Sequence, residues 1–152
     1  MGEKGGYNGR KTGGNGMDFE KLAAYRNAHN PFARKLGIHL EEIRQGYARA
    51  VKTVEPEETN PVGVPHGGVY FTLADVVCGA ASSSKGYMTV TVNALYNFLR
   101  SAKVGDRLIA EGREIKHGRT VNVYEARITD QDGALLGTGT FTFYQLDQKI
   151  PL

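Results

Sequence analysis

The order of apolar and polar positions predicts two short helices early in the chain. Asp18 can cap a helix in which apolar residues, beginning with Phe19 and Leu22, recur at helical spacing. Asn30 and the proline that follows it end this amphipathic run. A second brief segment, helical or a turn, is expected at 32–36.

Two extended segments follow, and we expect them to pair as a hairpin. They cover 38–43 and 47–54, and the Gln45-Gly46 pair between them can turn the chain back on itself. Residues 55–65 lack the periodicity of a helix or a strand, so a loop is expected there. This loop leads directly into the most apolar part of the chain.

Residues 66–82 are predicted to form the central helix of the fold. The segment is long, apolar on every side and rich in small residues. Such a pattern is typical of a helix that is buried all round rather than one that lies on a surface. We therefore expect this helix at the hydrophobic centre of the protein.

From Met88 onward, β-branched and aromatic residues predict a series of strands. The expected strands are 88–99, 107–116, 120–129 and 134–146. Turns around Gly105, Gly118 and Gly133 favour tight antiparallel connections, and hence a meander. Two early strands, a central helix and a run of long strands predict an α+β fold, with an antiparallel sheet wrapped round the helix and the helices on one face.

Length and composition indicate one domain with a flexible leader. The chain has 152 residues, of which 1–16 include seven glycines and almost no aliphatic side chain. We expect a single domain at 17–152. Cys78 is the one cysteine, so it can form neither an internal disulfide nor a Cys-based zinc site. We therefore expect a cytoplasmic protein with no metal site.

The charge and the longest apolar run exclude two classes of partner. A formal net charge of +3 is too small to indicate nucleic acid, and it is compatible with an anionic small ligand. The longest apolar run, 69–81, is interrupted by Asp75 and is shorter than the roughly 18 to 20 residues that a bilayer span needs. The sequence therefore predicts neither nucleic-acid binding nor membrane association.

Asp75 is the candidate for chemistry, because it is the one charged side chain between His66 and Ser84. A carboxylate in such apolar surroundings is costly unless it is paired. It is either a structural acid that a hydroxyl or a backbone donor satisfies, or a functional group. The pattern by itself leaves both readings open.

His66-Gly67-Gly68 lies where the predicted helix begins, so its backbone N–H groups can point at an approaching oxygen. This arrangement predicts an oxyanion hole, although a glycine pair before a helix is also a common turn. Asp75 lies eight residues after Gly67, about two turns or roughly 12 Å along the helix. A dimer, in which Asp75 reaches a substrate held by Gly67 of the other subunit, is the simplest way to join the two groups.

The chain resembles hotdog-fold acyl-CoA thioesterases of the phenylacetate-degradation type, within the 4-hydroxybenzoyl-CoA thioesterase superfamily. The resemblance covers about Asp18 to Leu146. The matching motifs are Asn60-Pro-Val-Gly-Val-Pro-His66-Gly67-Gly68, Phe71-Thr72-Leu73-Ala74-Asp75, Asn-Pro-Phe-Ala-Arg at 30–34, Asn-Phe-Leu-Arg at 97–100 and Lys-His-Gly-Arg-Thr at 116–120. It implies a hotdog fold, an antiparallel sheet wrapped around a long central helix.

The resemblance also implies a role for the two groups at the central helix. Asp75 would act as general base on water or as nucleophile on the thioester carbon. The Gly67 N–H would stabilise the oxyanion that develops. Asn60 matches the position whose amide orients substrate or water, and His66 either hydrogen-bonds near the thioester or fixes the loop.

Relatives hold the attacking water with a Ser or Thr on the strand after the central helix, and alignment to Asn97 places Thr91 there. Because the interval from Asp75 is shorter than in relatives, Thr89 and Asn93 are the alternatives. A strand residue that simply packs or faces solvent is an equally open reading.

Substrate contacts are expected mainly at basic residues near strand ends, which suit the phosphates of coenzyme A. The expected substrate-binding set is Gly68, Asn93, Arg100, Lys116 and Arg119, drawn from a basic group that also contains Lys103, Arg107 and Arg113. Coenzyme A is part of the substrate, and no separate cofactor is expected. Tyr70, Tyr87, Tyr96, Phe98 and Leu99 either line the acyl pocket or belong to the core.

The expected function is hydrolysis of a small aryl or short-to-medium acyl-CoA by a homodimer at minimum, in a family that often forms homotetramers. One alternative is a non-catalytic acyl-CoA binding or sensor domain. A hotdog dehydratase or hydratase is a further alternative, although the spacing of His66 and Asp75 does not match those enzymes. The sensor would leave acyl-CoA intact, whereas the enzyme would release a thiol.

Overall fold

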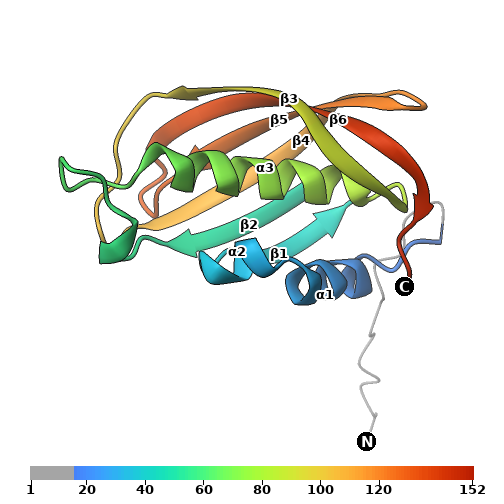
Figure 1. Ribbon diagram of the computed structural model, residues 1–152, viewed down its shortest axis with the longest axis horizontal. Coiled ribbons are helices and arrows are strands. Elements are labelled where there is room, and N and C mark those ends of the chain that lie inside the picture. The colour runs from blue at the N-terminus through green and yellow to red at the C-terminus, as the bar shows by residue number, and fades with distance from the viewer. Residues whose placement is uncertain (1–15) are drawn as a thin grey trace, which may run out of the picture.

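The structure is a computed structural model that describes residues 16–152, and it shows an antiparallel sheet curled round a long helix (Figure 1). The predicted leader lies outside the described residues, apart from Gly16. The helices are α1 (Phe19–His29), α2 (Pro31–Lys35) and α3 (Gly67–Ser83), with a 3-10 turn at Pro56–Glu58. The strands are β1 (His39–Arg44), β2 (Tyr47–Thr53), β3 (Tyr87–Phe98), β4 (Arg107–His117), β5 (Val121–Thr129) and β6 (Leu135–Lys149). The α+β prediction is confirmed.

The order of the strands differs from a meander. All neighbours pair antiparallel in the order β1-β2-β4-β5-β6-β3, so β3 lies at the edge beside β6. The turn before β4 explains why. Gly105 donates its N–H to the Val54 carbonyl, and Val54 donates to the Asp106 carbonyl, both at 2.9 Å. This turn therefore delivers β4 to β2 instead of folding it back on β3, and the prediction of a meander is wrong at this point.

The central helix, α3, is buried on all sides only in its second half. Every residue from Val76 to Ser83 is buried, packed among core side chains such as Tyr124 and Phe141. In the first half Gly68 is exposed, and Phe71 keeps 39% of its surface exposed. The prediction of all-round burial is thus wrong for the start of the helix, where the sheet of the same chain leaves one face uncovered.

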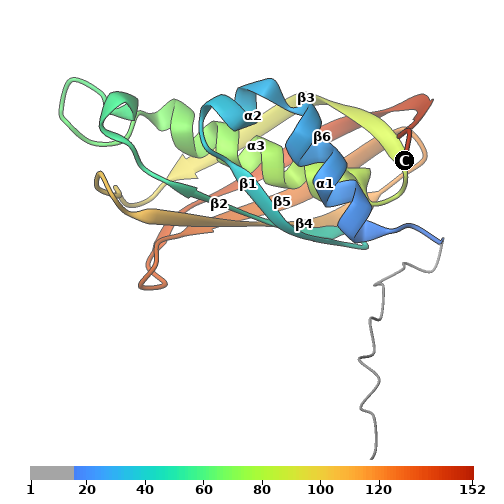
Figure 2. The same cartoon turned by 90° about the horizontal axis from the view of Figure 1, so that it is seen from below.

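Helices α1 and α2 lie at the β1 side of the sheet, as Figure 2 shows from below. Asp18 caps α1 as predicted and accepts a hydrogen bond from the Lys21 N–H. Asn27 fixes α1 to the outer edge of β1, because its side chain donates to the Leu40 carbonyl (3.0 Å) and accepts from the Leu40 N–H (2.9 Å). One side chain therefore satisfies the backbone of an edge strand, a position that would otherwise invite pairing with another chain.

Candidate active site

Asp75 projects from α3 toward β3 and is partly buried. Its Oδ1 accepts a hydrogen bond of 2.6 Å from the Thr91 hydroxyl. Burial raises the pKa of the Asp75 carboxyl above its ordinary value, while the Thr91 hydrogen bond and the charge of Arg26 oppose that rise. The carboxylate is therefore held by a single hydroxyl in a partly desolvated place, which suits a general base or a nucleophile.

Thr91 is the strand residue that the structure brings to Asp75, among the three that the sequence left open. It pairs with Phe143 across β3 and β6, and Phe143 is buried in the core. A bulge lies between Thr91 and Asn93, so Asn93 pairs with Thr142, the neighbour of Phe143 on β6. The side chain of Asn93 therefore lies on the face of the sheet opposite to that of Thr91. Thr89 makes no hydrogen bond to Asp75. Within one chain, neither Asn93 nor Thr89 joins the Asp75 group.

The start of α3 leaves one backbone donor for a ligand. The Gly68 N–H donates to His66 Nδ1 at 2.8 Å, and the Val69 N–H donates to the His66 carbonyl at 2.9 Å. The Gly67 N–H has no protein acceptor among residues 16–152. Because an N–H at a helix start carries part of the positive end of the helix dipole, Gly67 is the donor that can stabilise an oxyanion.

His66 caps α3, since its Nδ1 accepts the Gly68 N–H. When the ring is neutral, the proton must then be on Nε2, because Nδ1 acts as the acceptor. This contact matches the second of the two roles expected for His66, fixing the loop, and it leaves Nε2 available for the first. This contact also occupies the N–H of Gly68, so the backbone of Gly68 is not available to donate to a substrate.

Asn60 lies in the loop before α3 and organises it. Its Oδ1 accepts from the N–H groups of Val62 (3.0 Å) and Val64 (3.3 Å), which closes a turn. Its Nδ2 has no partner in the described part of the chain, so the amide keeps two donors for a ligand. The loop is also fixed to strand β2, because Glu58 forms an ion pair of 2.5 Å with the buried Lys52.

A cavity of about 310 Å³ lies between Asn60 and Gly67. It is lined by Asn60, Pro65, Gly67, Tyr70, Phe98, Leu99, Arg100 and Ser101. The Phe98 ring lies 3.2 Å from the place that a Cβ on Gly67 would occupy, so the wall leaves little room for a side chain there. Of the predicted aromatic residues, Tyr70 and Phe98 line the cavity, whereas Tyr96 is buried in the core.

Asp75 does not line this cavity. It lies two turns along α3 from Gly67, so one chain holds two separate groups. Asn60, Gly67 and Arg100 form the first, and Asp75 with Thr91 forms the second. The sequence prediction that these groups need two subunits is compatible with this separation.

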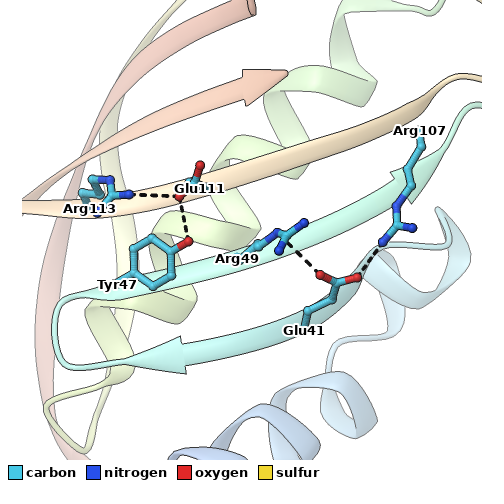
Figure 3. A network of polar contacts seen from close by, with 6 residues as sticks. All are labelled: Glu41, Tyr47, Arg49, Arg107, Glu111 and Arg113. Atoms are coloured by element: carbon cyan, nitrogen blue, oxygen red, sulfur yellow. Dashed lines mark hydrogen bonds and ion pairs between the residues drawn. The ribbon is translucent and has the colours of Figure 1, made fainter. Parts of the chain in front are cut away.

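The predicted basic residues divide into three places. Arg107 and Arg113 belong to a polar network on β1, β2 and β4, where Arg107 pairs with Glu41 (2.7 Å) and Arg113 with Glu111 (3.0 Å) (Figure 3). Tyr47 also donates to Glu111 at 2.7 Å. This network lies on the sheet face away from α3, since the intervening Ala48 and Ala50 of β2 are buried toward the helix. Ion pairs therefore engage these two arginines away from the cavity.

The remaining predicted cations lie at opposite ends of the molecule. Arg100 lines the cavity near Gly67. Lys116 and Arg119 lie at the β4–β5 turn, at the far end of α3 from Gly67 (Figure 1). All three are exposed. Within one chain the structure does not bring Lys116 and Arg119 to Gly67.

One charged residue near Asp75 was not predicted as part of the site. Arg26 of α1 acts electrostatically on Asp75, although 49 positions separate them in the sequence. The available signal was its position on the buried face of α1, seven residues after Phe19. That spacing indicates a shared helix face, but nothing in the sequence says which element this face meets.

Two further findings limit the chemistry of residues 16–152. No group of three or more His, Cys, Asp or Glu side chains there is placed to hold a metal ion. No helix in this part of the chain is long and apolar enough to cross a membrane. Cys78 is fully buried, and burial raises the pKa of its thiol far above the ordinary value, so it packs as an apolar residue.

Residues 62–136 match the family model described as the thioesterase superfamily. Acyl-coenzyme A thioesterase PaaI of Escherichia coli is 32% identical over 113 residues, which are 71% of this chain and 81% of that protein. Acyl-coenzyme A thioesterase 13 of Homo sapiens is 30% identical over 127 residues, which are 81% of this chain and 90% of that protein.

Solved structures agree with the sequence comparison. The E. coli PaaI protein of the phenylacetic acid degradation operon has a TM-score of 0.83 at 26% identity, over 87% of this chain and 96% of that one. A hypothetical thioesterase of Streptococcus pneumoniae, solved with coenzyme A, has a TM-score of 0.71 at 32% identity, over 74% and 91% of the two chains. That protein has also been solved with an aspartate and with a threonine replaced by alanine, at positions 16 residues apart.

Proposed function

Because this chain belongs to the thioesterase superfamily and has the hotdog fold, we propose that it hydrolyses an acyl-CoA thioester to a free acid and coenzyme A at a site shared by two subunits. One observation carries the proposal. Asp75 is partly buried and held by Thr91, while the Gly67 N–H that could stabilise an oxyanion has no acceptor within residues 16–152 and lies two turns away. Neither half is sufficient for hydrolysis by itself.

The relatives support both the substrate class and the pair of side chains. Two of them are named acyl-coenzyme A thioesterases, and the S. pneumoniae relative was solved with coenzyme A. The aspartate and the threonine replaced in that relative have the same separation, 16 residues, as Asp75 and Thr91. This match supports a joint role for the two side chains.

Strand β3 supports the shared site, because it offers a second copy a free edge. It is the last strand of the sheet, with β6 on one side only. Its exposed apolar side chains include Val92, Leu95 and Phe98, at 58%, 66% and 58% exposure. A long apolar edge strand is a liability unless it is covered. Antiparallel pairing of β3 with its copy, together with the uncovered face of α3, would bring Asp75 of one subunit toward Gly67 of the other.

The reaction can proceed through either of two roles for Asp75. As general base, the carboxylate takes a proton from water while the water oxygen attacks the thioester carbon. As nucleophile, the carboxylate forms an acyl anhydride that water then hydrolyses. In both cases negative charge develops on the carbonyl oxygen, where the Gly67 N–H stabilises it, and the thiolate of coenzyme A leaves and takes up a proton.

The size and lining of the cavity are evidence for an acyl group of modest size. Its volume of about 310 Å³ is at the lower end for a ligand site, and aromatic side chains such as Tyr70 and Phe98 form part of its wall. We propose a small aryl or short-to-medium acyl chain on this basis. Arg100 at the cavity rim, with Lys116 and Arg119 of the partner subunit, would then face the phosphates of coenzyme A.

Thiol release tests the proposal directly. Wild-type protein and Asp75→Asn are incubated with short, medium, long and aryl acyl-CoAs, and a thiol-reactive dye reports free coenzyme A. We expect release by the wild type and a loss of at least about a thousandfold in Asp75→Asn, in the range that removal of a catalytic group gives. Asn keeps the shape and one acceptor, so circular dichroism and acyl-CoA binding should be unchanged.

Three results would contradict the proposal in different ways. Asp75→Asn activity within a few fold of wild type would remove Asp75 from the chemistry. Tight acyl-CoA binding with no thiol release from any member of the panel would instead support a non-catalytic binding domain. Hydration or dehydration of an enoyl-CoA, followed by its absorbance, would favour the hydratase alternative.

A further inference from the structure

Arg26 is a buried charge that the proposed reaction does not use. It lies on α1 and is half-buried as a residue, while its Nε is fully buried and makes no hydrogen bond to any described residue, 16–152. Burial lowers the pKa of the guanidinium to about 10, so it remains charged at neutral pH. A charge in such a place is costly unless an opposite charge accompanies it.

Glycine at position 79 allows Arg26 to approach α3. The Arg26 Nη2 lies 3.3 Å from the place that a Cβ on Gly79 would occupy. Gly79 is one helical turn after Asp75, so the two positions share a face of α3. The Phe143 ring lies 3.6 Å from the same point, and Phe143 pairs with Thr91 across the sheet. The guanidinium therefore lies against the helix face that presents Asp75, on the side where Thr91 holds it.

The charges around Asp75 are few. Arg26, from α1, is the cation that acts on Asp75 within residues 16–152. Cys78, on the same helix, is fully buried, and its thiol stays neutral. Tyr25 acts electrostatically on Arg26, and Glu125 acts on Cys78, although Glu125 itself is exposed on β5. In the described part of the chain, Arg26 thus supplies the one charge that favours the ionised carboxylate.

We propose that Arg26 is a positioning residue that keeps Asp75 ionised for the hydrolytic step. This inference rests on the proposed function, because it assumes that the Asp75 carboxylate acts on the thioester or on water. Burial alone would favour the protonated, inactive acid. The charge of Arg26 offsets that tendency.

The pH dependence of kcat/KM for thiol release tests this role. The variants are Arg26→Met, which keeps the length and removes the charge, and Arg26→Lys, which keeps the charge. At low pH, kcat/KM falls as Asp75 takes up a proton, and this part of the profile is its acid limb. In Arg26→Met the acid limb should move to higher pH, because a buried carboxylate without a neighbouring cation holds its proton more strongly. Below the midpoint of the limb, kcat/KM should be about tenfold lower than wild type, and the two profiles should converge at the high-pH plateau. Arg26→Lys should restore most of the difference.

Lys21→Met is the matched control, because Lys21 is an exposed cation on the same helix. Its profile should superimpose on that of the wild type. Gly79→Ala provides a second route, since a Cβ 3.3 Å from Nη2 requires the Arg26 guanidinium to shift by a few tenths of an ångström while its charge remains. It should move the limb in the same direction by a smaller amount, and it carries the test if circular dichroism shows that Arg26→Met does not fold.

The outcomes separate this inference from the proposed function. An unmoved acid limb in Arg26→Met and Gly79→Ala, with activity lowered equally at every pH, would overturn the role of Arg26 and leave a structural one. If Asp75→Asn is inactive in the same experiment, the proposed function stands regardless. Activity that survives in Asp75→Asn would instead remove the premise on which the role of Arg26 rests.

Discussion

At the scale of single residues, the site depends on how one carboxylate is held. Asp75 is desolvated enough that burial raises its pKa, yet the Thr91 hydroxyl donates to it at 2.6 Å and favours the ionised form. A carboxylate that must be ionised to react loses activity as the pH falls through its pKa. The balance between burial, this hydrogen bond and the charge of Arg26 should therefore set the lower pH limit of the proposed reaction.

Thr91→Val tests this balance, because valine keeps the shape of threonine and lacks the hydroxyl. A hydrogen bond to a charged group contributes about 1.5 to 3 kcal/mol, so kcat/KM at neutral pH should fall roughly ten- to a hundredfold. The acid limb of the profile should move to higher pH, since the ionised form has lost its donor. Thr91→Ser should remain close to wild type. Equal activity in the valine and serine variants would show that the hydroxyl is not needed.

At the scale of elements, the loop before α3 is fixed by a buried ion pair. Lys52 of β2 pairs with Glu58 at 2.5 Å and also donates to the Leu36 carbonyl at the end of α2. The Glu58 carbonyl in turn accepts the His66 N–H at 2.8 Å. One pair of side chains thus connects β2, α2 and the start of α3, and it holds the loop that carries Asn60 and Gly67.

Breaking this buried ion pair should destabilise the fold more than breaking an ion pair on the surface would. Glu58→Gln leaves Lys52 charged and buried, and we expect a loss of about 3 kcal/mol in the free energy of unfolding, measured with urea. Glu57→Gln, at the exposed neighbouring position, should change it by less than about 0.5 kcal/mol. The double variant Lys52→Met with Glu58→Leu should recover most of the loss. A Glu58→Gln effect no larger than that of Glu57→Gln would show that the pair does not fix the loop.

At the scale of the whole molecule, one chain holds both halves of the site but does not bring them together. The cavity around Gly67 and the Asp75–Thr91 pair are two helical turns apart on α3. In the proposed dimer, a second copy would pack on the edge of β3 and on the uncovered start of α3 and would supply the missing half. Activity should therefore depend on association.

Leu95→Glu tests that dependence, because it places like charges on the two copies of β3 that would pair. Light scattering at micromolar concentration should show a dimer or larger assembly for the wild type and a monomer for the variant. Thiol release by the variant should fall by at least about tenfold, as expected when half of a catalytic site is lost. Val104→Glu, an exposed apolar position in the β3–β4 connection, is the control and should stay assembled and active. A wild-type monomer with full activity would contradict the shared site.

The sequence by itself determined the elements and the candidate chemistry. Helical and two-residue periodicities follow from local backbone geometry, so the two early helices, the β1–β2 hairpin and the central helix were predicted close to their observed bounds. The leader at 1–16 and the cytoplasmic location stay predictions. Asp75 was found as a functional candidate because a lone charge in an apolar helix is costly wherever that helix packs.

Only the tertiary structure decided which distant groups meet. The place of β3 beside β6, the choice of Thr91 over Thr89 and Asn93, and the approach of Arg26 to α3 all join segments far apart in the chain. Local patterns contain no information on such contacts, because they depend on how whole elements pack and on where one missing Cβ, at Gly79, leaves space. The Gly67 N–H is a further example, because it is left without an acceptor among residues 16–152 when His66 accepts from Gly68 instead.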